Sequence, residues 1–259
     1  MYSPVQIFGY TQSWYYIMQG VALIVTIIFF IWQLLPLLKS VGIVKALVFI
    51  PAFILFMYMG CRVFSLMEQS FATNQNIVFN FQHLMQGQLR WYGAVFVFGI
   101  TGIFILGVAF PFHKTAEEIF DILGMSLCLF AGIVKLGCQF SGDGCYGHVT
   151  NMPWGMHYLN GSFPSLLPVH PTPLYDSIYH IALFTLLFKM YRNGKMISGS
   201  IGFIFLISTA LFNFLLGYLR DMPILVFHLS FLQVCYLSLL VIASLQYLYF
   251  LKKHNYLKS

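Results

Sequence analysis

The chain has 259 residues, of which 59% are hydrophobic and only 8% are charged, with a net charge of +6. Soluble domains carry about 25% charged residues, so this composition excludes an ordinary soluble protein and predicts a membrane protein. The basic residues are scattered between apolar runs, which favours contact with anionic lipid headgroups and argues against nucleic acid as a partner.

Seven apolar runs follow one another along the chain, each long enough to cross about 30 Å of hydrocarbon as a helix. They cover residues 15–37, 42–60, 91–110, 118–137, 173–192, 198–219 and 224–251. The first run is too long for a signal-peptide core, so we expect it to be retained. The runs do not alternate in polarity as barrel strands do. The predicted fold class is all-α: a polytopic membrane protein of about seven transmembrane helices, with residues 1–259 forming a single domain.

The distribution of Lys and Arg predicts the orientation in the membrane. Seven spans place the two termini on opposite faces. If the N-terminus is outside, nine basic residues fall on or beside the inner segments and four fall outside. Because basic residues favour the cytoplasmic side, we expect the N-terminus outside and the C-terminus in the cytoplasm. The four outer basic residues are Arg62, Arg90, Lys135 and Arg220.

The stretch KLGCQFSGDGCYGHVTNMPWGM, residues 135–156, is unusually polar for this chain. Its glycines permit tight turns and bring backbone N–H groups close to an anion, and Lys135 adds a positive charge, so a phosphate is the simplest guest. Alternatively, the glycines only let the chain re-enter the membrane. Asp143 favours a functional loop, because an unpaired carboxylate at a membrane edge is costly.

Two cysteines of this stretch, Cys138 and Cys145, either form a disulfide, if the loop faces an oxidising compartment, or remain thiols. Zinc ligation by these cysteines and His148 lacks the usual spacing. We therefore expect no metal site.

His170 lies in the segment HPTPLYD, where two prolines fix the approach to the fifth run. Its imidazole can exchange a proton near neutral pH and so act as a general base for a thiol, but a histidine beside a helix start also serves as a structural hydrogen-bonding group. Arg62, Arg90 and Arg220 present a similar choice. Guanidinium groups hold phosphate through two hydrogen bonds, and they also anchor helix ends at headgroup level.

Six short segments occur in a distinctive order. They are SWYY (13–16), GCRVF (60–64), WYGAV (91–95), KLGCQFSGDGCYG (135–147), HPTPLYD (170–176) and LRD (219–221). In this order, and over nearly the whole chain, they resemble the bacterial prolipoprotein diacylglyceryl transferases. The resemblance implies a seven-helix enzyme of the bacterial inner membrane, with its site near the extracytoplasmic face. It also implies phosphatidylglycerol as lipid donor and the lipobox cysteine of a secreted lipoprotein precursor as acceptor, with no cofactor.

The resemblance also implies roles for single positions. Lys135 replaces an arginine that contacts the phosphoglycerol head, Tyr92 occupies the place of a catalytic His or Tyr, and Asp143 stands where many members have Glu. His170 and Asp176 brace the fifth helix. The catalytic candidates are Lys135, Asp143, His170 and Tyr92, and the substrate-binding candidates are Tyr15, Arg62, Arg90, Gly142, Tyr146, Gly147 and Arg220.

Several positions depart from the family pattern. Lys135 keeps the charge of arginine but lacks its planar fork. Asn213 and Gly217 stand where the sixth helix of the family carries an arginine and a glutamate. These differences leave two alternatives to prolipoprotein transfer open: a family relative that uses a phospholipid donor with another acceptor, and a lipid-binding protein or transporter without chemistry.

Overall fold

The computed structural model describes residues 5–7, 10–37, 55, 58–67, 70, 93–95, 98–99 and 113–256. The chain divides into two compact units. Unit 1 comprises Met1–Trp32, Met125–Met196 and Phe212–Met222, and unit 2 comprises Gln33–Gly124, Ile197–Leu211 and Pro223–Ser259. Helices α1, α6 and α8 contribute residues to both units.

Helices make up most of the described chain. They are α1 (Trp14–Leu34) with η1 (Leu35–Leu37), α6 (His113–Ser141), α7 (Thr172–Arg192), α8 (Ser200–Leu216) with η2 (Gly217–Leu219), and α9 (Phe231–Tyr256). Among the described residues, four segments are long and apolar enough to cross a membrane: Trp14–Leu37, Ala116–Ser141, Ser200–Leu219 and Phe231–Lys253. The predicted class, an all-α polytopic membrane protein, is confirmed.

The predicted runs at 15–37, 173–192 and 198–219 agree with α1–η1, α7 and α8–η2. The runs at 42–60 and 91–110 lie largely outside the described residues, so the number of spans and the orientation of the termini stay predictions. The predicted run at 118–137 lies within α6, which continues to Ser141, so Lys135 lies inside this helix. Its last turns stay helical because Cys138 and Gln139 are buried.

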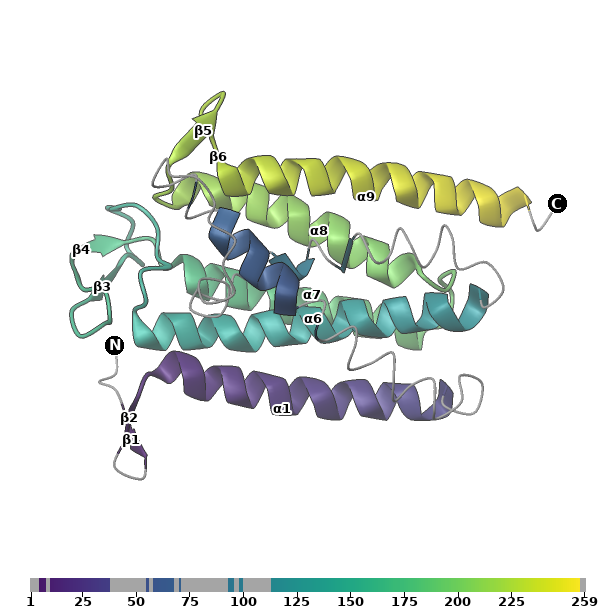
Figure 1. Cartoon of the computed structure of the whole chain (residues 1–259), viewed down its shortest axis with the longest axis horizontal. Helices are drawn as coiled ribbons and strands as arrows, with labels where there is room; N and C mark the ends of the chain where they lie inside the picture. The colour runs from purple at the N-terminus through teal and green to yellow at the C-terminus, as the bar shows by residue number, and fades with distance from the viewer. Residues whose placement is uncertain are drawn as a thin grey trace. The chain divides into compact units, whose positions relative to one another are not determined.

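Within unit 1, α1, α6 and α7 lie side by side (Figure 1), and two glycines of α6 allow the close contact. A Cβ at Gly137 would lie 2.9 Å from Cβ of Met18 in α1, and a Cβ at Gly132 would lie 2.8 Å from Cγ1 of Ile181 in α7. Both distances are shorter than carbon–carbon contacts at optimal separation, so larger residues would push these helices apart.

The described part of the chain also contains three short antiparallel hairpins: β1 (Val5–Ile7) with β2 (Tyr10–Gln12), β3 (Met156–Tyr158) with β4 (Ser165–Val169), and β5 (Ile224–Val226) with β6 (Leu229–Ser230). The predicted start of the last span at residue 224 is therefore wrong. Phe227 and His228 adopt positive φ in the turn, and α9 begins only at Phe231. The Ser230 and Gln233 side chains accept each other's backbone N–H in a capping box.

Within unit 2, the buried Asp121 of α6 has a structural role. Its carboxylate accepts hydrogen bonds from the backbone N–H groups of Gly199, at 2.7 Å, and Gly202, at 2.8 Å. These groups belong to the start of α8, where backbone donors have no partner within the helix. Asp121 therefore caps α8.

Candidate functional site

One buried carboxylate gathers three basic side chains in unit 1. Asp176, near the start of α7, has no exposed side-chain surface. Its Oδ2 lies 3.0 Å from Nζ of Lys135 in α6 and 2.9 Å from Nη2 of Arg220, the residue after η2. Its Oδ1 lies 2.9 Å from Nδ1 of His180, one turn further along α7. Three separate segments thus meet at Asp176.

The charges of this cluster do not cancel. Lys135 and Arg220 are almost buried, with 12% and 9% of their side chains exposed, and they share the single negative charge of Asp176. The three side chains sum to +1. A buried positive charge is costly unless it is paired, and its field attracts anions. The arrangement therefore suits a group with a negative charge, such as a phosphate.

Close backbone pairing brings Arg220 to this cluster. Gly147 pairs with Arg220 in an antiparallel bridge, and the N–H of His148 donates to the carbonyl oxygen of Leu219 at 2.8 Å. The N–H of Gly147 donates to the carbonyl oxygen of His170 at 2.9 Å. A Cβ at Gly147 would collide with the carbonyl oxygen of Leu219. Only glycine allows these segments to approach so closely.

The loop between α6 and Gly147 is tied to its surroundings. Gly142 and Gly144 adopt φ of 57° and 83°, values that other residues rarely take. Asp143 Oδ1 accepts the N–H of Cys145 at 3.2 Å. Thr172, the first residue of α7, donates its hydroxyl to the carbonyl oxygen of Cys145 at 2.6 Å. The loop is thus held against the start of α7.

Two thiols and a tyrosine lie beside the loop. Cys138 and Cys145 are free thiols in this structure. A hydrogen bond from Cys138 lowers the pKa of the Cys145 thiol. The charges of Lys135 and Arg220 lower this pKa further, whereas burial raises it. Tyr15, at the start of α1, packs against α6, because a Cβ at Gly137 would lie 3.2 Å from Cα of Tyr15. Of the predicted site residues, the structure thus brings Lys135 and Arg220 together on Asp176 and places Tyr15 against the last turns of α6.

Tyr146 lies against the hairpin that follows the loop. Its hydroxyl donates to the carbonyl oxygen of Phe163 at 3.0 Å, and its ring centroid lies 4.7 Å from that of Tyr158 in β3. The buried hydroxyl of Tyr158 donates to Oε1 of Gln139 at 2.9 Å, and burial raises the pKa of this hydroxyl. These contacts join the β3–β4 hairpin to the last turn of α6.

Comparison with known proteins identifies the family. The model of the prolipoprotein diacylglyceryl transferase family matches residues 4–250. The chain belongs to this family.

Curated relatives are named phosphatidylglycerol–prolipoprotein diacylglyceryl transferase. The protein from Leptospira interrogans is 34% identical over 134 residues, which cover 51% of this chain and 41% of the relative. That from Actinobacillus pleuropneumoniae is 27% identical over 154 residues, or 55% of each chain. That from Synechocystis sp. is 26% identical over 187 residues, covering 67% of this chain and 66% of the relative. The matched part of this chain thus spans about half the length of the first two relatives.

His170, for which the resemblance implies bracing of the fifth helix and which is also a catalytic candidate, lies just before α7. Its Nδ1 lies 3.3 Å from the hydroxyl of Tyr175, which also accepts the indole N–H of Trp154 at 2.8 Å. The backbone N–H of His170 donates to the carbonyl oxygen of His148 at 3.0 Å. His170 therefore connects α7 to the segment that carries Gly147, and a role as general base stays a prediction.

Of the other two arginines in the family motifs, the structure describes Arg62 but not Arg90. In unit 2, Nε and Nη2 of Arg62 donate to the Tyr58 hydroxyl at 3.1 and 2.9 Å. Arg90 and Tyr92 lie outside the described residues. A common pocket for Arg62, Arg90 and the Asp176 cluster therefore stays a prediction.

The predictions from sequence did not single out His180. It lies four residues after Asp176, the spacing at which side chains on one helix face meet, and this spacing is a signal that could have found it.

Proposed function

We propose that this protein transfers a diacylglyceryl group from phosphatidylglycerol to the cysteine thiol of a prolipoprotein. The thiolate sulfur attacks the glyceryl carbon that carries the phosphate ester. A carbon–sulfur bond forms, the carbon–oxygen bond breaks, and glycerol phosphate leaves with the bonding electrons. Family membership supports this reaction, and the names of the relatives supply the donor and the acceptor.

The observation that carries the proposal is the buried pair of cations on Asp176. The leaving group is a phosphate, and negative charge grows on its departing oxygen in the transition state. Lys135 and Arg220 hold one net positive charge in a nearly buried position, where electrostatic interactions are stronger than in water. Fixed donors aimed at developing charge lower such a barrier. We assign these two residues to the lipid phosphate.

The second task is to deprotonate an acceptor thiol, whose pKa is about 8.5. His170, Asp143 and Tyr92 are the candidates for this base. Lys135 and Arg220 also favour a thiolate held near them, because their charge stabilises an anion. We further propose that the protein lies in a bacterial inner membrane as a single transferase domain, with the site near the extracytoplasmic face. The bias of basic residues supports this orientation.

Lys135→Ala is expected to reduce transfer by about 100-fold or more, since it removes one of two cations that stabilise the leaving phosphate. The assay uses the full chain in vesicles that contain phosphatidylglycerol labelled in its diacylglyceryl part, with a lipobox peptide as acceptor. The matched control is Lys189→Ala, which removes an exposed lysine near the end of α7 and should leave the rate unchanged. Unchanged labelling in Lys135→Ala would remove Lys135 from the mechanism.

The same assay separates the alternatives. Labelled peptide together with free glycerol phosphate supports the proposal. Consumption of the lipid without labelled peptide indicates another acceptor. The reason to consider this outcome is that Asn213 and Gly217 replace two charged residues of the family. Lipid binding without consumption indicates a protein without this chemistry. Rescue of a bacterial strain depleted of its own transferase excludes both alternatives.

A further inference from the structure

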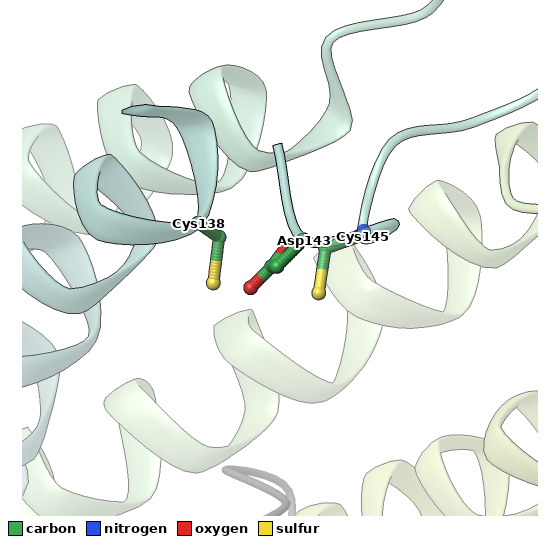
Figure 2. A group of neighbouring side chains, drawn as sticks. All are labelled: Cys138, Asp143 and Cys145. Carbon is green, nitrogen blue, oxygen red and sulfur yellow. Dashed lines mark hydrogen bonds between the residues drawn. The ribbon is translucent and has the colours of Figure 1, made fainter. Parts of the chain in front are cut away.

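Two thiols and a carboxylate converge at the end of α6. Cys138, Asp143 and Cys145 each place one potential ligand atom within 4.8 Å of the other two. Cys138 extends from the last turn of α6, and the other two residues belong to the loop that follows. Figure 2 shows the carboxylate of Asp143 between the two sulfur atoms, with all three side chains pointing to the same side.

We propose that these three residues bind a soft divalent metal ion of the zinc class. Zinc lies about 2.3 Å from a thiolate sulfur in tetrahedral sites, so two sulfurs on one ion are about 3.8 Å apart. The observed ligand atoms need to approach one another by about 1 Å at most to reach this geometry. Thiolate ligands select zinc over magnesium or calcium, and three protein ligands leave a fourth position open.

Cys138 and Cys145 lack the usual short spacing of zinc-binding cysteines, which normally brings the two sulfur atoms close together. Here a turn of the backbone brings them together instead. Gly142 and Gly144, both with positive φ, turn the chain back so that Cys145 returns to Cys138. The sequence argued against a zinc site that includes His148, and the structure places His148 3.9 Å from Asp221 in an exposed pair. Asp143 takes its place beside the sulfurs.

Neighbouring hydrogen bonds hold the ligand-bearing residues in position. The carbonyl oxygen of Cys138 accepts the N–H of Gly142 at 3.0 Å. The N–H of Cys145 orients the Asp143 carboxylate, and the Thr172 hydroxyl fixes the Cys145 carbonyl. Outer hydrogen bonds of this kind orient metal ligands before the ion arrives.

A bound ion would fasten the loop to α6 beside the Asp176 cluster. This inference does not depend on the proposed transfer reaction, because metal binding is measured without any lipid substrate. Either one can therefore fail while the other stands, and a metal-bound Asp143 would leave His170 and Tyr92 as the candidates for the base.

The test measures zinc in the purified full chain, first stripped with a chelator and then dialysed against Zn²⁺ or Mg²⁺. We expect about one zinc per wild-type chain and no retained magnesium, as the ligand set requires. Cys138→Ser/Cys145→Ser should retain at least about ten-fold less zinc. Cys235→Ser, which changes a thiol in α9, is the control and should retain zinc like the wild type.

Two further measurements do not require the double variant to fold. Cobalt in place of zinc should give the charge-transfer absorption of thiolate–cobalt bonds in the wild type. Zinc, but not magnesium, should raise the melting temperature of the wild type, because a ligand that binds only the folded state stabilises it. The proposal is overturned if the wild type retains no more zinc than the double variant. A disulfide between Cys138 and Cys145 would also overturn the proposal. It would lower the mass of protein taken directly from membranes by two hydrogens. A reductant would remove this mass difference, and Cys138→Ser would not show it.

Discussion

Asp176→Asn is expected to reduce diacylglyceryl transfer by about 100-fold or more, because misplaced catalytic groups lose this much activity. Asparagine keeps the shape of the side chain but removes the charge that holds Lys135 and Arg220 together. The two cations then repel each other in a nearly buried position. Leaving buried charges without their partner costs about 3–5 kcal/mol, so the free energy of unfolding should fall by a similar amount.

This variant separates positioning from simple charge. Removing a carboxylate makes the cluster more positive, so charge alone predicts tighter binding of an anionic lipid and a lower KM. If Asp176 positions the two cations, kcat must fall even where KM does not rise. A kcat equal to that of the wild type would show that Asp176 does not position them.

The control for Asp176→Asn is Asp221→Asn, because Asp221 is 89% exposed and its Oδ1 lies 3.9 Å from Nδ1 of His148. It should keep both activity and melting temperature. In a double variant, Lys135→Gln/Asp176→Asn, one of the two unpaired cations is gone, so about half of the lost stability should return. Activity should stay low, because the charge on the phosphate is still not stabilised. Recovery of activity together with stability would assign Asp176 a purely structural role.

Gly147→Ala is expected to have the second largest effect. The added methyl group would collide with the carbonyl oxygen of Leu219, the neighbour of Arg220. To make room, the segment that carries Arg220 must move away from Asp176. Overpacking of this kind costs about 1–3 kcal/mol of stability, and a displacement of about 1 Å can reduce a rate by about 100-fold. The transfer assay and thermal unfolding measure the two effects.

Gly20→Ala in α1 is the matched control, because a Cβ there meets no atom within 4 Å. Alanine also favours a helix over glycine by up to about 1 kcal/mol, so this variant should be active and at least as stable as the wild type. Should Gly147→Ala keep full activity, the close backbone contact is not what places Arg220.

The helical segments could be predicted from the sequence because unbroken apolar runs of membrane length leave the backbone few other choices. The start of the last helix could not. Residues 224–230 are as apolar as a span, yet they form a hairpin, since the Ser230–Gln233 capping box starts α9 only at Phe231. Lys135 lies within α6, as the predicted run at 118–137 implies, but that run does not show that Lys135 pairs with Asp176.

The candidate site was predicted in part. The sequence motifs indicated Lys135 and Arg220, and both lie on one carboxylate. Asp176 was expected only to brace the fifth helix, because nothing in its own segment shows which cations will reach it from other parts of the chain. The convergence of Cys138, Asp143 and Cys145 depends on the positive φ of two glycines, and cysteine spacing alone does not reveal such a turn.

The most direct test of the role of Lys135 and Arg220 compares the binding of two lipids with the same acyl chains. Phosphatidylglycerol carries the anionic phosphate, and diacylglycerol lacks it. Native mass spectrometry of the full chain should show at least about ten-fold preference for phosphatidylglycerol, the effect of about 1.4 kcal/mol from a charged contact. Lys135→Gln/Arg220→Gln should bind both lipids equally. A double variant that keeps the preference of the wild type would contradict the assignment of these two cations to the lipid phosphate.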